Sequence, residues 1–392
     1  MNFRVVIIGA GLSGLACAHG LARLGAEVAV YERDPSPTAR PQGYRIQLDP
    51  PGLIGLRQCL PPEVLQLCLA TAGTPLAPPR VLDHRLRPIT EQAGAPAAYN
   101  RQTQAYPFHR ATLREILLST LPAAVDFGRE CTGFDEHGDG RITVRFSDGH
   151  TDTADLLVGA DGVGSAVRAA LLPHARVDDA GLRLIYGLVP LPDRNLLPDW
   201  VFETMFTVAT GPERTHIGLG PVLFDHSRTT AITDRPTPVA DYLATMVGAR
   251  IDHPAMPPFP ELRRLDSRAL AELARRLIGD SWHPDLYRIL DHWDTTTLFP
   301  LRISTAAPVQ PWSGSAVTLL GDAIHAMSPV LAMGANTALR DAGELTTAIA
   351  TARTTGRRLN DAVTDYQRRM LAYAQPLVTA SQRVGRARVG QH

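Results

Sequence analysis

The chain has 392 residues, and its 39 acidic residues are balanced by 39 arginines with no lysine, so the formal net charge is zero and the isoelectric point lies near 7.2. This balance argues against nucleic acid or an anionic membrane as a main partner. The absence of lysine excludes any mechanism that needs a catalytic one. The length predicts one large domain or two interlocked ones.

The cysteines and the N-terminus set the remaining general expectations. The four cysteines are scattered and form no CxxC pair, which predicts neither a disulfide framework nor a zinc site. No apolar run approaches the length of a membrane span, and a glycine loop follows the first short strand too soon for a signal peptide. We expect a cytoplasmic protein that binds no metal and is a monomer or a homodimer.

The N-terminal segment has the layout of a dinucleotide-binding motif. An apolar strand at 5–8 leads directly into a glycine loop, and a helix with an apolar stripe follows. The first glycine permits the tight turn, the second lets a pyrophosphate approach the helix N-terminus, and the third lets helix and strand pack closely. The loop residues expected to bind the cofactor are Gly9, Gly11, Leu12, Ser13 and Gly14.

A second strand at 28–31 ends in Glu32, about twenty residues beyond the glycine loop. A carboxylate at this place accepts hydrogen bonds from ribose hydroxyls and disfavours a 2′-phosphate, so the site is expected to hold FAD or NAD rather than NADP. Its neighbour Arg33 is a further candidate contact.

The segment that follows is rich in proline and glycine. Arg45 begins a short expected strand near the cofactor, helical spacing covers 63–72, and 74–101 is expected to be loop. Arg110 precedes an amphipathic helix at 113–121, where it either contacts a phosphate or ribityl chain or simply faces solvent.

Two antiparallel strands are predicted at 126–134 and 141–146. A buried strand then runs into Asp161 and Gly162, which places a carboxylate at the C-terminal end of a strand, where open α/β sheets bind ligands. Arg168, one turn into the next helix, is placed to pair with Asp161.

A change of pattern from residue 182 predicts a separate antiparallel sheet that shields one side of a cavity. Its expected strands are 184–191, 201–209 and 216–224. The proline-rich segment 235–260 is expected to wrap the surface, helices are expected at 265–278 and 285–290, and 293–301 is expected to be extended.

The stretch 319–345 has the order of a ligand site. An apolar strand ends in Gly321 and Asp322, and Pro329 then excludes helix. Gly334 lets the backbone approach a ligand closely, and helical spacing starts at Asn336. The carboxylate suits a polyol, and the helix start suits an electron-rich ring.

The last segment, 359–388, has helical spacing interrupted by Pro376, which predicts a pair of packing helices and a solvated arginine-rich tail. The expected dinucleotide-binding domain comprises residues 1–70, 100–180 and 280–350. Residues 71–99 and 181–279 are expected to form the substrate domain, and 351–392 a helical segment.

The glycine loop with Glu32, the Asp161-Gly162 block and the Gly321-Asp322 block stand in a fixed order. This order resembles that of the FAD-dependent aromatic hydroxylases, the p-hydroxybenzoate-hydroxylase-like or class A flavoprotein monooxygenases, over nearly the whole chain. The resemblance implies an α/β fold with a Rossmann-like FAD-binding domain of the GR2 type, an interleaved antiparallel-sheet substrate domain and C-terminal helices.

The resemblance also implies residue roles. The glycine loop would hold the FAD pyrophosphate, Glu32 the adenosine ribose, and Asp322 the ribityl chain, while Pro329 would lie beside the reactive face of the flavin. The family usually has glycine where this chain has Ala332. The other flavin contacts that the resemblance implies are Arg110, Asp161, Gly162, Gly321, Gly334, Ala335 and Asn336.

The activity implied by the resemblance is hydroxylation of an aromatic or polyketide-like substrate with O2 and transiently bound NADPH or NADH, through a flavin C4a-hydroperoxide. The segments expected to form the cavity walls, 45–100 and 182–260, have few charge clusters, which favours a neutral, hydrophobic substrate. The overall composition suggests a role in specialised metabolism. His216, Tyr186 and His325 are acid–base candidates, although a lone histidine or tyrosine in a β segment is more often structural.

Three alternatives to a monooxygenase can be separated by sequence or by assay. An FAD-dependent oxidase or dehydrogenase that takes hydride from its own substrate would not consume NAD(P)H. A flavin-dependent halogenase needs a lysine and usually a WxWxIP segment, and this chain has neither. A flavin-binding scaffold with a decayed site would show no turnover with any reductant.

Overall fold

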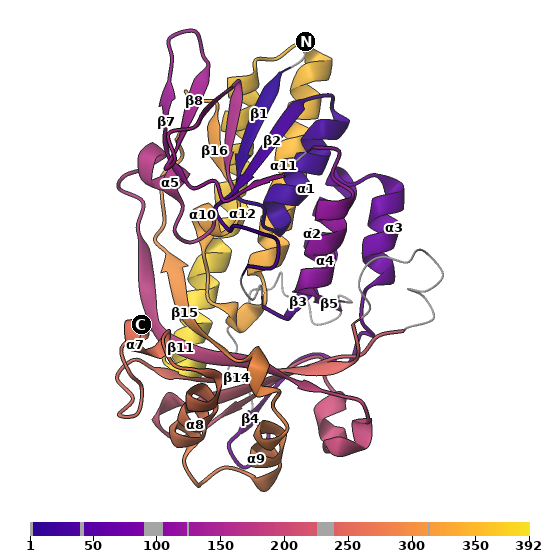
Figure 1. Ribbon diagram of the computed structural model, residues 1–392, viewed down its shortest axis with the longest axis vertical. Coiled ribbons are helices and arrows are strands. Elements are labelled where there is room, and N and C mark those ends of the chain that lie inside the picture. Colours follow the sequence, from indigo (N-terminus) through magenta and orange to yellow (C-terminus); the bar gives the residue numbers. More distant parts are fainter. Residues whose placement is uncertain (1–2, 40–42, 90–104, 124, 226–238, 313) are drawn as a thin grey trace.

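Two β-sheets organise the structure, a computed structural model that describes residues 3–39, 43–89, 105–123, 125–225, 239–312 and 314–392. In Figure 1 the first sheet and its helices occupy the upper part, and the second sheet crosses below them. Parts of the predicted loop 74–101, of the domain range 71–99 and of the segment 235–260 lie outside the described residues.

The first sheet is wholly parallel. In spatial order its strands are β16 (Val317–Leu319), β10 (Leu156–Gly159), β1 (Arg4–Ile8), β2 (Glu27–Glu32) and β6 (Val125–Phe127). The central strands are continuous apolar runs because helices and loops cover both faces. The predicted strand 126–134 is therefore wrong in extent: its start is the edge strand β6, and its end belongs to another sheet.

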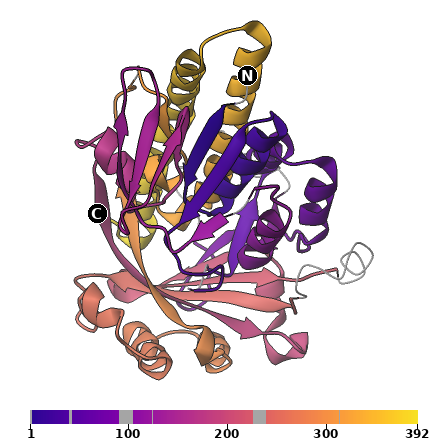
Figure 2. The ribbon, with the colours of Figure 1, turned by 45° about the horizontal axis from the view of Figure 1, so that its top comes forward.

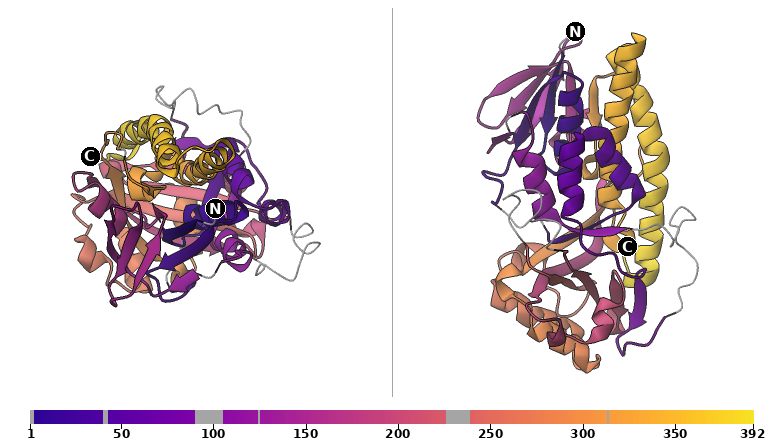
Figure 3. Two further views of the ribbon diagram at one scale, coloured as in Figure 1. Left: turned by 90° about the horizontal axis from the view of Figure 1, so that it is seen from above. Right: turned by 90° about the vertical axis from the view of Figure 1, so that its right-hand side faces the viewer.

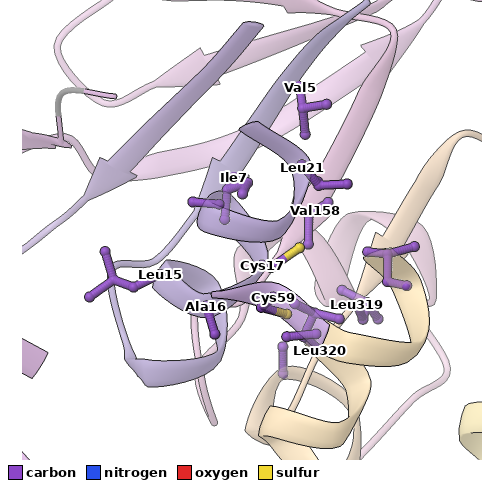
Figure 4. Packing of buried hydrophobic residues seen from close by; sticks show 14 of the residues in the cluster. Val5, Ile7, Leu15, Ala16, Cys17, Leu21, Cys59, Val158, Leu319 and Leu320 are labelled. Carbon is purple, nitrogen blue, oxygen red and sulfur yellow. The ribbon is translucent and has the colours of Figure 1, made fainter. Parts of the chain in front are cut away.

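Helices from distant parts of the sequence pack on this sheet. They are α1 (Leu12–Arg23), α2 (Pro50–Cys59), α3 (Pro62–Ala70), α4 (Arg110–Ser119) and α11 (Gly334–Thr355). Figure 4 shows Cys17 of α1 and Cys59 of α2 packed beside Leu319 and Leu320, so these thiols serve as core residues. Helix α2 was not predicted, because its Pro-Pro-Gly start looks like a turn; Asp49 caps it by accepting a hydrogen bond from Gly52 N.

The second sheet has six strands and is antiparallel except where β12 pairs with β4. In spatial order they are β15 (Phe299–Ala306), β11 (Val177–Pro190), β14 (Tyr242–Arg250), β13 (His216–Val222), β12 (Thr207–Thr210) and β4 (Arg80–Asp83). Figure 2 shows this sheet crossing beneath the first.

Two expectations for this region are wrong. The predicted strand 201–209 is strand only from Thr207, because its start is the 3-10 turn η2 (Asp199–Phe202). The segment 235–260 does not simply wrap the surface, since β14 lies between β11 and β13 inside the sheet. The prolines that flank β14 obscured an apolar run whose residues are nearly all buried.

The far face of the second sheet is covered by α8 (Ser267–Ile278) and α9 (Pro284–Asp291), with the short α7 (Phe259–Leu262) nearby. Asp266 caps α8 by accepting a hydrogen bond from Ala269 N, and an apolar stripe along α8 packs under the strands. The opposite face of the second sheet, which these helices do not cover, points toward the first sheet. Residues 284–306 join this second sheet and its helices, although the expected division assigns them to the FAD-binding domain.

The chain ends in one helix, α12 (Leu359–Val389), rather than the predicted pair. Pro376 lies inside it, where proline disfavours a helix by about 3 kcal/mol. Packing overrides this penalty: the Tyr366 hydroxyl donates to Leu319 O at 3.0 Å, and Ser381 Oγ donates to Ser328 O at 2.8 Å. Figure 3 shows α12 beside α11 in the upper part of the molecule, with α12 continuing down toward the second sheet.

Smaller elements complete the fold. A two-stranded sheet pairs β3 (Arg45–Leu48) with β5 (Tyr106–His109), and a three-stranded sheet contains β7 (Cys131–Glu136), β8 (Ile142–Phe146) and β9 (Thr151–Ala154). The other 3-10 turns are η1 (Arg194–Leu196), η3 (Pro212–Arg214), η4 (Thr295–Thr297) and η5 (Pro329–Leu331). Within the described residues, no helix has the length and apolarity needed to cross a bilayer.

Candidate functional site

A cavity of about 780 Å³ lies where the C-terminal ends of β1, β10 and β16 meet the near face of the second sheet. All three strand ends contribute lining residues, as expected for a ligand site in an open α/β sheet. The opposite wall comes from the second sheet, with lining residues on β4, β11, β12, β13, β14 and β15. The cavity therefore joins the predicted cofactor motifs to the predicted substrate sheet.

The glycine loop forms one end of the cavity, and its three glycines have different geometry. Gly9 has φ of +106°, and a Cβ on it would lie 2.3 Å from Ala160 O. A Cβ on Gly14 would lie 2.1 Å from Gly9 O. A Cβ on Gly11 would meet nothing within 4 Å, and Gly11 lines the cavity. Two glycines thus allow close backbone packing, and the third leaves room for a ligand.

The first turn of α1 is open toward this space. Gly11 is its N-cap, and no side chain caps the helix, so its first N–H groups remain available to an anion. Leu12 and Ser13 also line the cavity.

Two buried charged side chains hold the loop from behind. Glu32 accepts hydrogen bonds from Ala10 N at 2.9 Å and Asp34 N at 3.0 Å. Arg114 donates from Nε to Ala10 O at 2.8 Å, and its side chain is only 4% exposed. No sequence signal pointed to Arg114, because its partner lies about a hundred residues earlier in the chain.

Asp161 and Gly162 follow β10 and line the cavity beside the glycine loop. Asp161 Oδ2 accepts hydrogen bonds from Ala166 N at 2.7 Å and Val167 N at 3.3 Å, at the start of α5 (Ala166–Leu171). Burial raises the pKa of Asp161. The predicted pairing with Arg168 is wrong.

The Arg168 guanidinium instead donates to two backbone carbonyls, Ala323 O and Val163 O, each at 2.9 Å. These bonds tie the loop after β10 to the loop after β16. Backbone N–H groups already bind the Asp161 carboxylate, and the buried Ala323 carbonyl and the partly buried Val163 carbonyl take the Arg168 donors.

The Gly321-Asp322 block forms the next part of the wall. Gly321 has φ of +57° and precedes α10 (Asp322–His325). Asp322 is exposed and lines the cavity, so its carboxylate is free to accept hydrogen bonds from a ligand. Pro329, at the start of η5 (Pro329–Leu331), is also exposed toward the cavity.

Ala332 follows η5 in a left-handed conformation, with φ of +53° and ψ of +27°. A side chain there costs about 1–2 kcal/mol relative to a right-handed geometry, which is why glycine suits the position. The expected departure from the family pattern is thus visible as local backbone strain.

Helix α11 begins directly after this turn. Gly334 and Ala335 line the cavity, and no side chain caps the N-terminus of the helix. Asn336 is buried and is not among the described lining residues. Its amide donates to Gln47 O at 2.9 Å and accepts from Asp49 N at 2.9 Å, so it fastens the helix start to the segment between β3 and α2.

The second-sheet side of the cavity is largely apolar. Alternation along β11, β13 and β14 directs one set of side chains into the cavity and the other into the core under the sheet. Gly218 and Gly220 of β13 leave space that the Phe206 ring occupies. The lining side chains of this floor are Leu184, Tyr186, Phe206, Val208, His216 and Met246.

Tyr186 and His216 are polar groups on β11 and β13, and Arg80, Arg302 and Ser304 of β4 and β15 also line this side of the cavity. Tyr186 stacks on Tyr44 with a centroid distance of 5.7 Å, and burial raises its pKa. Burial lowers the pKa of His216 to about 4, an effect that a backbone contact with Arg214 only partly offsets. His216 is therefore neutral at physiological pH and can accept or donate a single hydrogen bond through each ring nitrogen.

The third acid–base candidate is placed elsewhere. His325 is buried behind the loop, binds Asp341 and does not line the large cavity in the described structure. It is not positioned to meet a substrate.

Several arginines reach the cavity. Arg33 and Arg110 line its dinucleotide end. Arg45 donates to Met205 O at 2.9 Å and lies over the Phe206 ring. The expectation of a solvated arginine tail is wrong for Arg388, which lines the cavity and donates to Val330 O at 3.3 Å, whereas Arg383 and Arg386 are exposed.

The residues present fit FAD. The space in front of Gly11 and the uncapped start of α1 suit a pyrophosphate, and Glu32 and Asp322 are placed along the same wall to accept from hydroxyl groups. The uncapped start of α11 offers a positive dipole end to an electron-rich ring.

Comparison with known proteins agrees with this geometry. Residues 290–381 match a family model described as an FAD binding domain, and residues 7–58 match one described as an NAD(P)-binding Rossmann-like domain. The chain superposes with a TM-score of 0.82 and 29% identity on a protein from Photorhabdus luminescens described as a candidate FAD-containing monooxygenase, covering 99% of both chains.

Curated relatives point the same way. The dual O-methyltransferase/FAD-dependent monooxygenase elcB of Phaeosphaeria nodorum is 33% identical over 371 residues, and the match covers 87% of this chain but 39% of that protein. The chain thus spans about two fifths of the length of that relative. The 3-amino-4-hydroxybenzoate 2-monooxygenase PtmB3 of Streptomyces platensis is 31% identical over 356 residues, covering 86% of this chain and 77% of that protein.

The chain belongs to the p-hydroxybenzoate-hydroxylase-like family of FAD-dependent monooxygenases. FAD is the cofactor that this family and the site share.

Gly11→Ala tests whether the open space in front of Gly11 holds FAD. The added methyl group projects into open space, so we expect the apoprotein to keep its stability within about 0.5 kcal/mol while the Kd for FAD rises at least tenfold. Gly9→Ala, at positive φ with a backbone clash, should instead lose at least about 2 kcal/mol of stability. Fluorescence titration measures the Kd and urea unfolding measures the stability. Wild-type FAD affinity in Gly11→Ala would contradict the binding of FAD in front of Gly11.

Ala332→Gly tests the strained turn. Removing the side chain from the left-handed conformation should raise the free energy of unfolding of the apoprotein by up to about 1 kcal/mol. Ala335→Gly, within the first turn of α11, is the matched control and should lower it by about 0.5–1 kcal/mol. A loss of stability in Ala332→Gly would show that the turn is not strained.

His216→Gln tests the neutral imidazole. Because the folded-state pKa lies below the unfolded value near 6.5, the wild type should lose stability relative to this variant as pH falls from about 6.5 toward 4. The slope should reach at most about 1.4 kcal/mol per pH unit. The exposed His174→Gln should show no such difference, and identical acid unfolding of wild type and His216→Gln would contradict the assignment.

Proposed function

We propose that this chain is an FAD monooxygenase that uses NAD(P)H and O2 to hydroxylate an aromatic or polyketide-like ring. The proposal is based mainly on one cavity, which extends from the glycine loop to the largely apolar face of the second sheet. The names of the relatives support it, since one is a monooxygenase of an amino-hydroxybenzoate and another a dual methyltransferase–monooxygenase.

Each part of the wall has a proposed contact with FAD. The glycine loop would hold the pyrophosphate at the start of α1, and Glu32 would accept from the adenosine ribose. Arg110 would approach the flavin chain, Asp322 the ribityl hydroxyls, and Pro329 one face of the ring. The further proposed contacts are Leu12, Ser13, Arg33, Arg45, Asp161, Gly162, Gly321, Gly334, Ala335 and Asn336, the last of these through its backbone.

When bound, FAD supplies the transfer of electrons from the nicotinamide to O2 and the activation of one oxygen atom. The chain's own residues supply placement and environment. The apolar floor would orient a planar, neutral ring and keep water away from the reacting atoms. The start of α11 would stabilise negative charge on the flavin edge that faces it.

We propose that His216 and Tyr186 face the substrate. His216 is neutral and would accept a hydrogen bond from a phenolic hydroxyl, which orients the ring, but its lowered pKa makes it a weak acceptor of the whole proton. Tyr186, whose raised pKa keeps it protonated, can donate a hydrogen bond to the same ring edge. The nicotinamide would dock transiently beside Asp161 and Gly162, and either NADH or NADPH could serve.

The test is reductant consumption by the FAD-loaded protein in air, with a panel of phenolic and polycyclic compounds and with peroxide followed in parallel. We expect some compounds to accelerate NADH or NADPH oxidation by at least tenfold without stoichiometric peroxide. His216→Gln should lower the accelerated rate while leaving FAD content unchanged. Flavin reduction by a substrate alone, without NAD(P)H consumption, would identify an oxidase or dehydrogenase instead.

A further inference from the structure

A buried carboxylate lies behind the Gly321-Asp322 turn and is not part of the cavity wall. Asp341, on α11, is 0% exposed and accepts three hydrogen bonds. They come from Gly321 N at 2.8 Å, His325 Nε2 at 2.6 Å and the Tyr373 hydroxyl at 2.6 Å. We name Asp341, His325, Tyr373 and the Gly321 N–H the Asp341 cluster.

The cluster joins three elements that pack behind the cofactor wall. His325 ends α10, Asp341 lies in α11, and Tyr373 lies in α12. Burying a carboxylate without partners is strongly unfavourable, so the three donors fix where these elements can sit. A hydrophobic side chain would fill the space, but it could not accept from Gly321 N.

The contact with Gly321 is the one that reaches the ligand. Gly321 has φ of +57° and ψ of −135°, a combination that residues with a side chain avoid. Its N–H donates to Asp341, and the next residue is Asp322, whose carboxylate lines the cavity. The hydrogen bond therefore sets the direction in which Asp322 leaves the strand.

We propose that Asp341 is a positioning residue for FAD: its carboxylate holds the Gly321 turn so that Asp322 meets the ribityl chain. The proposal rests on the proposed contact between Asp322 and FAD. It assigns no chemistry to Asp341, which does not line the cavity among the described residues.

Charge supports the geometry. Burial disfavours the protonated form of His325, but the charge and hydrogen bond of Asp341 outweigh this effect and raise its pKa. The other charged or titratable groups facing the cluster are Asp322 on α10, Arg340 and Glu344 on α11, and Tyr366 on α12. The pKa values of Tyr366 and Tyr373 are raised by burial and by Asp341, so both stay protonated.

The sign of the pH effect follows from the raised pKa of His325. The ion pair is fully present below the unfolded-state value near 6.5 and is lost as pH rises through the higher folded-state value. Above that value the Nε2–H of neutral His325 can still donate, but the buried Asp341 carboxylate loses its countercharge, which destabilises the cluster that holds the Gly321 turn. FAD affinity should therefore weaken as pH rises through the raised pKa of His325.

Asp341→Leu, which fills the space but cannot accept from Gly321 N, is the main test, read out as the Kd for FAD by fluorescence titration of the full-length apoprotein. We expect a Kd at least tenfold above that of the wild type. Glu344→Gln removes a carboxylate from the same helix, where it pairs with Arg369 rather than with Gly321, and should change the Kd less than twofold. Equal FAD affinity in Asp341→Leu and the wild type would overturn the proposal.

Two further measurements keep the test decisive if Asp341→Leu does not fold. Tyr373→Phe preserves the bonds to Gly321 and His325, so its Kd for FAD should stay within threefold of wild type. The wild-type Kd should rise with pH above neutral, and His325→Gln should remove this rise. A flat wild-type profile would overturn the proposal, and because no turnover is measured, a failed hydroxylation assay leaves the result intact.

Discussion

The contact of Gly9 with Ala160 and Gly14 is the constraint on which the site depends. Cβ atoms on Gly9 and Gly14 would lie 2.3 Å and 2.1 Å from backbone oxygens, so only glycines let β1, β10 and α1 converge so closely. This convergence places the ends of three parallel strands at one edge. Glu32 and the buried Arg114 then hold the loop from behind, and Gly11 is left facing open space.

The second sheet supplies a sheet face that is open to a ligand, which the first sheet lacks. Parallel strands with helices on both sides leave no free face, whereas an antiparallel sheet covered by α8 and α9 on one side keeps the other for a ligand. Polar groups are few on that face, and burial keeps His216 uncharged. A family that oxygenates rings needs this pairing, because the cofactor requires hydrogen bonds while the substrate requires a dry, flat surface.

Local motifs were predictable, and long-range partners were not. The glycine loop, Asp161 and the Gly321-Asp322 turn stand out because each motif is complete within a few residues of sequence. Strand β14 was missed because flanking prolines masked a buried run, and Pro376 misled because packing outweighed local propensity. Arg114 and Asp341 carried no signal, since their bonds to Ala10 and Gly321 exist only after folding. The roles assigned to individual site residues stay predictions.

Oxygen insertion is the central claim, and labelled oxygen tests it most directly. The FAD-loaded protein would be supplied with NADH or NADPH and an accepted aromatic compound under ¹⁸O2, and the product analysed by mass spectrometry. A monooxygenase would place one ¹⁸O atom from ¹⁸O2 in each product molecule. In a parallel reaction with labelled water and ordinary O2, the product would carry no label. A product that gains no oxygen, or gains it from water, would contradict a monooxygenase and leave an oxidase or dehydrogenase on the same fold.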